Sequence, residues 1–256
     1  MFSTTEITSH EIGSDNVIHQ RLFYAYVEAA KIISGNVLEL GCGAGRGMRA
    51  IAQACDGYTG IDKNEKLLER LQAAYPDFHF RHQSIPPLTG VKDNSFDYVV
   101  TFQVIEHIED DKKFLEEIHR VLRPGGQAII TTPNLEKSLT RNPWHVREYK
   151  HQELEALLKK YFSEAEVKGI GGTKPVIDYY EKNRASVRRI TRFDILNLQY
   201  RIPRRLLQVP YEILNRRNRK KLMHQNQGVV SGVTVDDYFF CEDPAEGFDF
   251  FCIACK

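Results

Sequence analysis

Four glycines fall within seven consecutive positions directly after an apolar run, in the stretch VLELGCGAGRG. They are Gly41, Gly43, Gly45 and Gly47. Glycine lets the backbone turn sharply and lets a ligand touch the main chain. A glycine-rich turn between a strand and a helix lies at the carboxyl end of a parallel sheet, where such sheets bind their ligands. The stretch therefore predicts an α/β fold with a ligand site at this turn.

The spacing of the glycines excludes two common ligands. The dinucleotide fingerprint G-x-G-x-x-G needs a third glycine, but counting from Gly41 or Gly43 puts Arg46 or Met48 there. That conflicts with a nicotinamide-dependent oxidoreductase, and the absence of a following Gly-Lys-Ser/Thr excludes a P-loop. Asp62, in GIDKN, comes 21 residues after Gly41, where a carboxylate can accept both hydroxyls of a ribose. Together these features suit a ligand with a ribose but no pyrophosphate.

Apolar runs alternate with helical patterns from residue 36 onwards, which is typical of a parallel sheet covered by helices on both faces. We expect strands at VLEL (37–40), YTGI (58–61), FHFRH (78–82), FDYVVTF (96–102), QAIITT (127–132), AEVKGI (165–170) and FDFFCIAC (248–255). Helical spacing predicts helices near 45–55, 67–75, 110–122 and 154–162. The fold class is therefore α/β, a Rossmann-like doubly wound sheet of seven strands.

The composition is that of an ordinary globular protein, with 42% apolar and 27% charged residues in 256. No apolar run reaches the roughly 20 residues of a membrane-spanning helix, and the polar N-terminus lacks a signal-peptide profile. We therefore expect a cytoplasmic protein. The five cysteines are an odd number without framework spacing, which predicts free thiols.

Two segments depart from the alternating pattern. Residues 13–34 predict an amphipathic helix within an N-terminal helical arm (1–34), and the Arg-rich stretch 173–230, which includes Phe193 and Ile195, predicts a helical insertion before the final strand. Residues 181–221 hold 13 Lys or Arg against 3 Asp or Glu, a charge of 13 − 3 = +10, which leaves 1 − 10 = −9 for the rest of the chain. The insertion is a solvated lid, a surface for an anionic substrate or anionic membrane lipids, or a nucleic-acid contact. Because the chain is nearly neutral overall and carries no RNA-binding module, we do not expect a nucleic-acid partner.

Five motifs carry a resemblance to a known family. VLELGCGAG, GIDKN, IPPLTGVKDNSFDYVV, FQVIEHIED and RVLRPGGQAIITTPN resemble, in order, the motifs of class I S-adenosylmethionine (SAM)-dependent methyltransferases, and among these the type 11 and ubiquinone/menaquinone branches. The match covers about residues 20–170 and resumes at the final strand, which the resemblance implies is antiparallel. It further implies one methyltransferase domain over residues 1–256, with SAM as cofactor.

The resemblance also assigns residues to the cofactor. It implies that Gly41 and Gly43, with Cys42 between them, lie against the methionine part of SAM, that Glu39 holds the loop and the amino group, and that Asp62 takes the ribose. Further implied contacts are Lys63 beside the adenosine, Gln83, Ser84 and Ile85 lining the adenine, Gln103 beneath the sulfonium, and Arg21 and Tyr24 on an arm that closes over the cofactor.

Catalytic candidates follow the fourth predicted strand. His107 is a candidate base and Glu106 a candidate orienting group; the alternative is that both brace the loop. The resemblance places the acceptor near the stretch NPWHVREY, which makes Trp144, His145, Arg147 and Tyr149 substrate candidates, or packing residues of a loop. We expect a small-molecule or lipid-like acceptor, methylated at oxygen, nitrogen or carbon in that order.

Three alternatives remain at this stage. Residues 103–107 (QVIEH) with the distant His145 resemble the metal-binding pattern E-x-x-E-H plus histidine of small-RNA 2′-O-methyltransferases. One alternative is therefore an RNA or nucleotide-linked acceptor methylated in the same way. Here Gln103 replaces the first acid, and losing a charged oxygen ligand weakens a divalent site, so we expect no metal. The remaining alternative is a protein that binds SAM without turnover.

Overall fold

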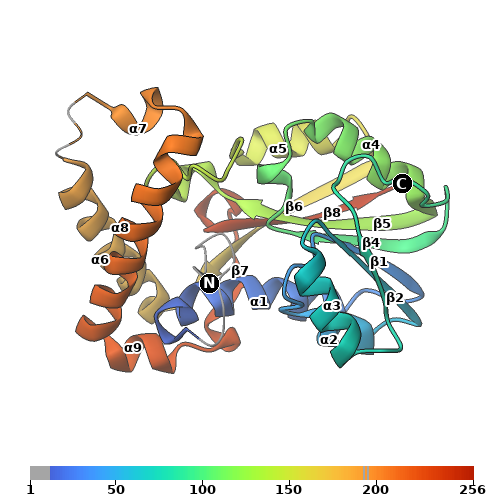
Figure 1. Cartoon of the computed structure of the whole chain (residues 1–256), viewed down its shortest axis with the longest axis horizontal. Coiled ribbons are helices and arrows are strands. Elements are labelled where there is room, and N and C mark those ends of the chain that lie inside the picture. Colours follow the sequence, from blue (N-terminus) through green and yellow to red (C-terminus); the bar gives the residue numbers. More distant parts are fainter. Residues whose placement is uncertain (1–11, 193, 195) are drawn as a thin grey trace.

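The computed structural model describes residues 12–192, 194 and 196–256; the first eleven residues of the predicted arm, and Phe193 and Ile195 of the predicted insertion, lie outside the described residues. A single eight-stranded sheet runs through the molecule in the order β3-β2-β1-β4-β5-β8-β6-β7 (Figure 1). The strands are β1 (Asn36–Leu40), β2 (Gly57–Asp62), β3 (His79–His82), β4 (Phe96–Phe102), β5 (Leu122–Pro133), β6 (Glu164–Gly172), β7 (Tyr238–Phe240) and β8 (Asp249–Cys255).

The predicted sheet is confirmed in class and corrected in number. Strands β1 to β5 pair in parallel, and β8 lies antiparallel between β5 and β6, as the resemblance implies. The eighth strand, β7, pairs antiparallel with the end of β6. It has only three residues, too few for an alternating apolar pattern to show in the sequence.

Helices cover both faces of the sheet (Figure 1). They are α1 (Asn16–Ala30), α2 (Met48–Gln53), α3 (Glu65–Ala74), α4 (Asp111–Val121), α5 (His151–Leu158), α6 (Lys174–Thr191), α7 (Leu198–Arg201), α8 (Arg204–Gln225) and α9 (Gln227–Gly232). The core accordingly forms two clusters, one containing buried side chains of α1, α2 and α3 and the other those of α4 and α5. Neighbouring residues of one strand, such as Val37 and Leu38 of β1, belong to opposite clusters because successive side chains point to opposite faces.

Helix α4 shows how local sequence sets these elements. The side chain of Asp110 accepts a hydrogen bond from the Lys113 N–H at 2.9 Å and so caps the helix. Phe114, Leu115 and Ile118 recur at helical spacing and are fully buried against the sheet. Cap and apolar face together define the helix that follows the catalytic candidates.

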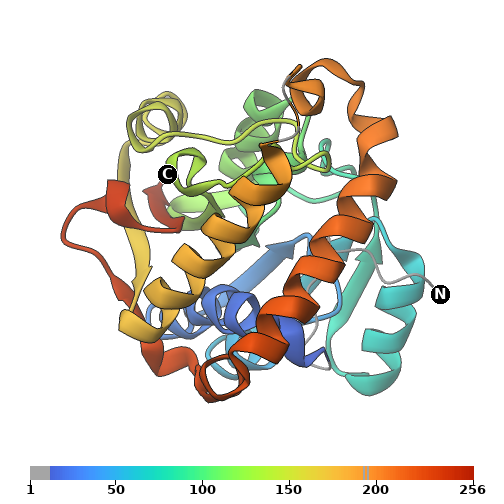
Figure 2. The same ribbon diagram turned by 90° about the vertical axis from the view of Figure 1, so that its left-hand side faces the viewer.

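Helices α6 to α9 form the segment between β6 and β7, and α6 and α8 run side by side across one end of the molecule (Figure 2). Buried Asp15, just before α1, pairs with Arg219 at 3.0 Å and with Arg216 at 3.1 Å, both on α8. The side chain of Asn218 accepts from the Ser186 hydroxyl of α6 at 2.6 Å. The insertion is therefore tied both to itself and to the start of α1.

All five cysteines are free, as their odd number predicts. Within the described ranges, no helix combines the length and the apolar character that crossing a bilayer requires.

Candidate functional site

The glycine turn connects β1 to α2 and has one open position. Gly41 has φ +76°, its N–H donates to the Ile61 carbonyl at 2.8 Å, and a Cβ there would meet the Val104 side chain at 2.4 Å. Gly43 has φ +52°, and a Cβ built on it meets nothing within 4 Å. Gly41 is therefore required by the fold itself, whereas Gly43 leaves space in which an outside group can reach the main chain.

The other two glycines of the turn serve close packing. A Cβ on Gly45 would lie 2.7 Å from the Leu71 side chain, and one on Gly47 would lie 2.0 Å from the ring of Tyr26. Both contacts bring a helix against the turn, from α3 and α1 respectively. The run of glycines thus combines one ligand-accessible position with three that the fold needs.

Asp62 ends β2 and holds the turn from the side. Its Oδ2 accepts from the Gly43 N–H and its Oδ1 from the Asn64 N–H, each at 2.8 Å. A carboxylate offers about four lone-pair sites, so these two bonds leave acceptor capacity for hydroxyl groups. Next to it, Lys63 is exposed, and its carbonyl oxygen bonds the His82 ring at 3.0 Å.

Glu39 lies beneath the turn and is fully buried. Its two oxygens accept from the hydroxyls of Tyr26 at 2.8 Å and Tyr58 at 2.7 Å. Burial raises the pKa of the Glu39 carboxyl to about 7, partly offset by the two tyrosine bonds. Glu39 thus fixes Tyr26, the ring that packs on Gly47. Cys42 is also buried, and burial raises the pKa of its thiol.

Gln83 offers an unused acceptor on the far side of Asp62. Its N–H donates to the Asp62 carbonyl at 3.0 Å, and its Nε2 donates to the Pro87 carbonyl at 2.5 Å. Its side-chain oxygen Oε1 is buried without a hydrogen-bond partner, which is costly unless something outside the chain donates to it. Ser84 is exposed and Ile85 half-buried against the core.

Gln103 follows β4 in an uncommon backbone conformation. Its φ is +58°, which non-glycine residues adopt at a cost and which clusters at functional sites. Its N–H donates to the Thr131 carbonyl at 3.0 Å and its Nε2 to the Thr131 hydroxyl at 3.3 Å. The neighbouring strand β5 therefore holds this conformation in place.

The two arm candidates lie one turn apart on α1 and contact different partners. Arg21 pairs through Nε with Asp249 Oδ2 at 2.8 Å and lies over the Phe248 ring. Tyr24 is buried, with its ring 5.5 Å from that of Phe240, and burial raises the pKa of its hydroxyl. The α1 residue that contacts the glycine turn is Tyr26, which the sequence analysis did not single out.

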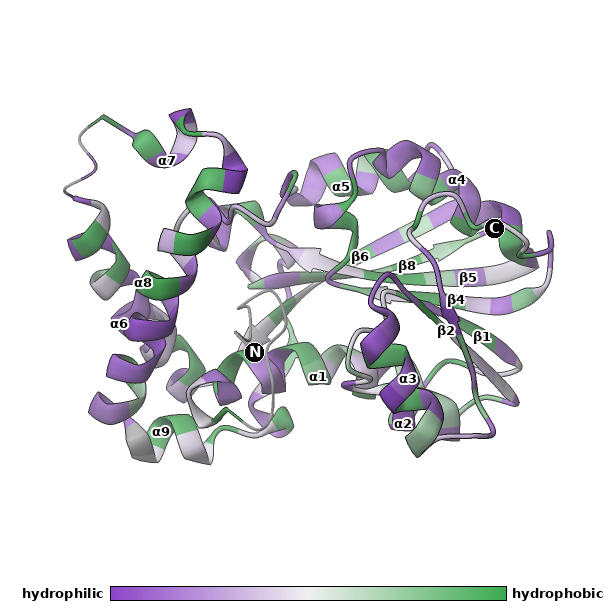
Figure 3. Cartoon of the chain, viewed as in Figure 1, coloured by the Kyte–Doolittle hydropathy of each residue, from purple (hydrophilic) through white to green (hydrophobic). Residues whose placement is uncertain are grey.

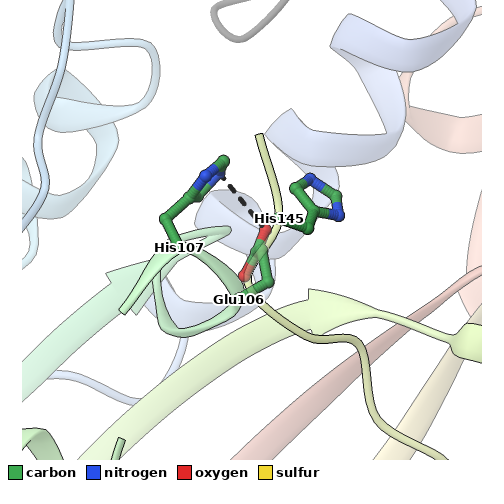
Figure 4. Close-up of side chains that lie close together, drawn as sticks. All are labelled: Glu106, His107 and His145. Carbon is green, nitrogen blue, oxygen red and sulfur yellow. Dashed lines mark ion pairs between the residues drawn. The ribbon is translucent and has the colours of Figure 1, made fainter. Parts of the chain in front are cut away.

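Glu106, His107 and His145 form a cluster (Figure 4). Each offers one possible ligand atom, a carboxylate oxygen or a ring nitrogen, and these atoms lie within 4.8 Å of one another. Glu106 Oε2 accepts from the Thr132 hydroxyl at 3.0 Å, and Glu106 Oε1 lies 4.0 Å from His107 Nε2. The two histidine rings are perpendicular, with their centres 4.9 Å apart. Two elements distant in sequence, the turn after β4 and the loop after β5, therefore meet here.

Hydrogen bonds define the protonation of the two rings. His107 Nδ1 lies 3.0 Å from the Trp144 carbonyl, which can only accept, so Nδ1 carries the proton and Nε2 is the basic nitrogen of the neutral ring. His145 Nδ1 lies 2.6 Å from Glu148 Oε1, while the Asn142 amide donates to His145 Nε2 at 2.7 Å. Both nitrogens of His145 are thus engaged by protein groups, and a metal ion on this cluster would have to displace one of them.

Burial and charge shift two pKa values in this cluster. Burial raises the pKa of Glu106 to about 7, against the opposing effect of His145. For His145, burial lowers the pKa, but the hydrogen bond to Glu148 and the negative charges of Glu106, Glu148 and Asp249 outweigh it and raise the pKa overall. Both shifts favour the protonated form, of the Glu106 carboxyl and of the His145 ring.

The four substrate candidates divide between two roles. His145 lines the cavity described below. Arg147 pairs with Asp111 at 2.7 Å, and the buried Tyr149 hydroxyl donates to the same carboxylate at 2.8 Å. The Trp144 indole N–H donates to Glu212 of α8 at 3.0 Å. The polar groups of Arg147, Tyr149 and Trp144 thus anchor the loop to α4 and α8.

A cavity of about 480 Å³ lies between the end of β5, α1, α6 and α8. Arg21, Asp249 and His145 line it from the sheet side, and Tyr179, Tyr211 and Leu214 from the insertion. Its volume lies in the range of small-molecule sites. Asp249 is a lining residue that was not among the predicted site residues, although an acid at the start of the apolar strand FDFFCIAC is a signal in the sequence.

Known proteins are similar in sequence mainly to the part of the chain that contains β1 to β5. Residues 38–130 match the family described as a methyltransferase domain. A probable S-adenosylmethionine-dependent methyltransferase of Mycolicibacterium smegmatis is 37% identical over 162 residues, 61% of this chain and 63% of that protein. A ubiquinone biosynthesis O-methyltransferase of Paracidovorax citrulli is 33% identical over 103 residues, 38% of this chain and 43% of that protein. The chain thus matches less than two thirds of the length of these relatives.

Solved structures match more of the chain at lower identity. A SAM-dependent methyltransferase from Thermotoga maritima superposes with a TM-score of 0.57 at 16% identity, covering 94% of this chain and 92% of that one. One from Archaeoglobus fulgidus gives a TM-score of 0.54 at 14% identity, with coverages of 94% and 93%. At such identities the likeness shows the fold alone.

Proposed function

Residues 38–130 are a methyltransferase domain of the class I SAM-dependent type, and from this premise we propose that the chain transfers a methyl group from SAM to a small-molecule or lipid-like acceptor. The observation that carries the proposal is the open position at Gly43, immediately beside the Asp62 carboxylate. In this proposal the acceptor occupies the cavity beneath the insertion, residues 173–230, which acts as its lid.

The residues of the turn fit an adenosyl ligand. Gly43 leaves room at the main chain, Asp62 retains acceptor capacity for ribose hydroxyls, and Gln83 Oε1 is an unpaired acceptor for an adenine amino group. In the proposal, Gly41, Cys42 and Gly43 hold the methionine part, and Lys63, Ser84, Ile85 and Gln103 complete the surroundings. Glu39 acts indirectly, because both of its oxygens are engaged by tyrosines that brace the turn.

SAM supplies, when bound, a methyl group on a positively charged sulfur that is already activated towards nucleophiles. The chain therefore has to position the acceptor and, for an O–H or N–H nucleophile, accept its proton. Nε2 of His107 is the basic nitrogen for that task, since Nδ1 is held by the Trp144 carbonyl. Glu106 stabilises the protonated histidine through its carboxylate at 4.0 Å.

The cavity supports an amphipathic acceptor. Apolar side chains such as Val176 and Leu214 line it together with polar groups such as Asn183 and Tyr179. The Arg21–Asp249 pair and His145 place charged groups on the sheet side. An acceptor with an apolar body and one polar end would fit this distribution.

Binding and turnover are tested separately. Calorimetric titration should show binding of SAM and S-adenosylhomocysteine but not of NAD, and Asp62→Ala should weaken SAM binding by about 1–3 kcal/mol, the scale of lost hydrogen bonds to a charged group. Unchanged affinity in this variant would refute the ribose assignment.

Turnover is measured with SAM carrying a labelled methyl group and a total lipid and metabolite extract. Transfer of label to an extract component, reduced at least tenfold in His107→Asn while SAM affinity stays the same, is the expected result. Binding without any label transfer would instead identify a protein that holds SAM without turnover.

A further inference from the structure

Helix α8 carries two apolar faces. Leu207 and Leu214 point into the cavity, together with Pro210. Leu206, Val209 and Ile213 do not line the cavity, and they are 69%, 67% and 49% exposed. The first apolar face is explained because it lines the cavity. The second, exposed face has no function in the site already described.

The exposed face is continuous. Spacings of three and four residues place Leu206, Val209 and Ile213 on one side of the helix. Among the described residues, eight of the twelve exposed large apolar side chains fall within residues 181–221, a sixth of the chain. Single exposed apolar residues are normal, but a cluster of this kind marks an interaction surface.

Cations extend this apolar stripe. Arg217 and Lys220, four and seven residues after Ile213, lie on the same side of α8, and Arg205 precedes Leu206; all three are exposed. In Figure 3 apolar and hydrophilic stretches alternate along α7 and α8, at the opposite end of the molecule from β1 and β2.

The acids of residues 181–221 are engaged elsewhere. Glu212 accepts from Trp144, Asp194 accepts from the N–H groups of Leu198 and Gln199, and Glu181 pairs with Arg184. Acids outside the segment neutralise some of its other cations, since Asp15 pairs with Arg216 and Arg219 and Glu109 pairs with Arg204. Within the described part of the chain no ion pair is formed by Arg205, Arg217 or Lys220, the cations that border the stripe.

We propose that the outer face of α8 docks on the surface of an anionic phospholipid bilayer. Leu206, Val209 and Ile213 enter the boundary between headgroups and acyl chains, while Arg205, Arg217 and Lys220 contact lipid phosphates. An apolar stripe bordered by cations is the pattern of helices that lie in the membrane interface. Each cation near an anionic surface strengthens such binding about fivefold.

Charge decides between the bilayer and other occupants. A second copy of this chain would bring the same +10 segment against the first, so the two surfaces would repel each other. Nucleic acid would satisfy the cations, but its phosphate backbone offers nothing apolar to cover Leu206 and Val209. An anionic bilayer satisfies both the charged and the apolar parts of the surface.

The test is co-sedimentation of the whole chain with vesicles. We expect binding to vesicles of phosphatidylcholine mixed with phosphatidylglycerol, little binding to phosphatidylcholine alone, and release as the salt concentration rises. The stripe variant Leu206→Gln/Val209→Gln/Ile213→Gln and the charge variant Arg205→Gln/Arg217→Gln/Lys220→Gln should each lower the partition coefficient at least about tenfold.

The matched control removes the same charge from another surface. Lys66→Gln/Arg70→Gln/Lys112→Gln replaces three exposed cations of α3 and α4 and should bind anionic vesicles within about threefold of the wild type. SAM titration of every variant reports folding, and it also separates this proposal from the proposed function, because docking requires no methyl transfer.

Four results would overturn the proposal. They are equal sedimentation with both vesicle types, an equal loss in the control variant, a wild-type dimer that the stripe variant dissociates in analytical ultracentrifugation, and binding to single-stranded RNA without binding to vesicles. If a variant loses SAM binding through misfolding, the proposal is still tested by comparing how the wild-type chain binds the two vesicle types.

Discussion

The glycine turn and the cavity are held together by contacts of different range. Around the turn, Asp62 bonds Gly43 and Asn64, and Glu39 bonds Tyr26 and Tyr58, so the partners lie within 19 positions of each other. Around the cavity, Asp15 reaches Arg216 across 201 positions, and Arg21 pairs with Asp249 from the last strand.

This difference shows that the contacts of the glycine turn are set mainly by nearby residues, whereas those of the cavity are not. The polar contacts of the turn join near neighbours, although Val104, Leu71 and Tyr26 also pack against its glycines. The cavity depends on segments that only the complete fold brings together, so its shape can change without altering the turn. Four kinds of substitution test whether the turn and the cavity are independent in this way.

Replacing Asp15 should separate the two halves most clearly. Asp15→Asn leaves Arg216 and Arg219 without their buried counter-charge, and breaking a buried ion pair from one side costs about 3–5 kcal/mol. We expect lower unfolding free energy and faster proteolysis within residues 173–230, while SAM affinity stays within about twofold. Denaturant unfolding and limited proteolysis measure the first two effects, with exposed Asp236→Asn as the control. A large loss of SAM affinity would show that the halves are coupled.

Glu39 makes the stability of the turn depend on pH. The pKa of the Glu39 carboxyl is about 7 in the folded state and 4.5 ordinarily. Between these two pH values the folded chain therefore retains a proton that the unfolded chain releases. The unfolding free energy should therefore fall as pH rises from about 4.5 to 7, by up to about 3 kcal/mol from Glu39. Urea unfolding of wild type and Glu39→Gln at several pH values isolates this contribution. Parallel pH profiles for the two proteins would contradict the prediction.

Gly43 and Gly125 form a matched pair for the ligand position. Both have positive φ, and a Cβ on either meets nothing within 4 Å, so alanine should cost each site a similar 1–2 kcal/mol of stability, roughly. Only Gly43→Ala should weaken SAM binding, by about tenfold or 1.4 kcal/mol, because only that methyl group occupies the proposed approach to the main chain. Calorimetry on the two variants compares them directly. Equal SAM affinities would remove Gly43 from the cofactor site.

The smallest expected effect concerns the contact between the loop after β5 and helix α8 of the insertion. Trp144→Phe removes the indole N–H that donates to Glu212 and keeps most of the apolar volume. We expect a loss of about 1 kcal/mol in unfolding free energy and a higher KM for the acceptor, with unchanged SAM affinity. Thermal unfolding and steady-state kinetics measure these quantities. A change in SAM affinity alone would contradict the assignment of Trp144 to the contact between the loop and α8.

The same difference in range explains what the sequence could predict. The seven long strands, the cap at Asp110 and the positions of Gly43 and Asp62 follow from patterns within about 30 residues. The tyrosine pair around Glu39 and the Arg21–Asp249 pair could not be predicted in this way. Their partners lie on different elements, and such contacts produce no periodic pattern in the local sequence. Trp144, Arg147 and Tyr149 illustrate the limit: the loop was found, but the direction of each side chain depends on Asp111 and on α8.

The place of β8 has a consequence for synthesis on the ribosome. This strand follows all the others in the chain, yet it lies between β5 and β6 and supplies antiparallel partners to both. Until Cys255 has emerged from the exit tunnel, those two strands expose unpaired edges, which are prone to pair with other chains. A nascent polypeptide stalled within the insertion therefore lacks the strand that covers these two edges.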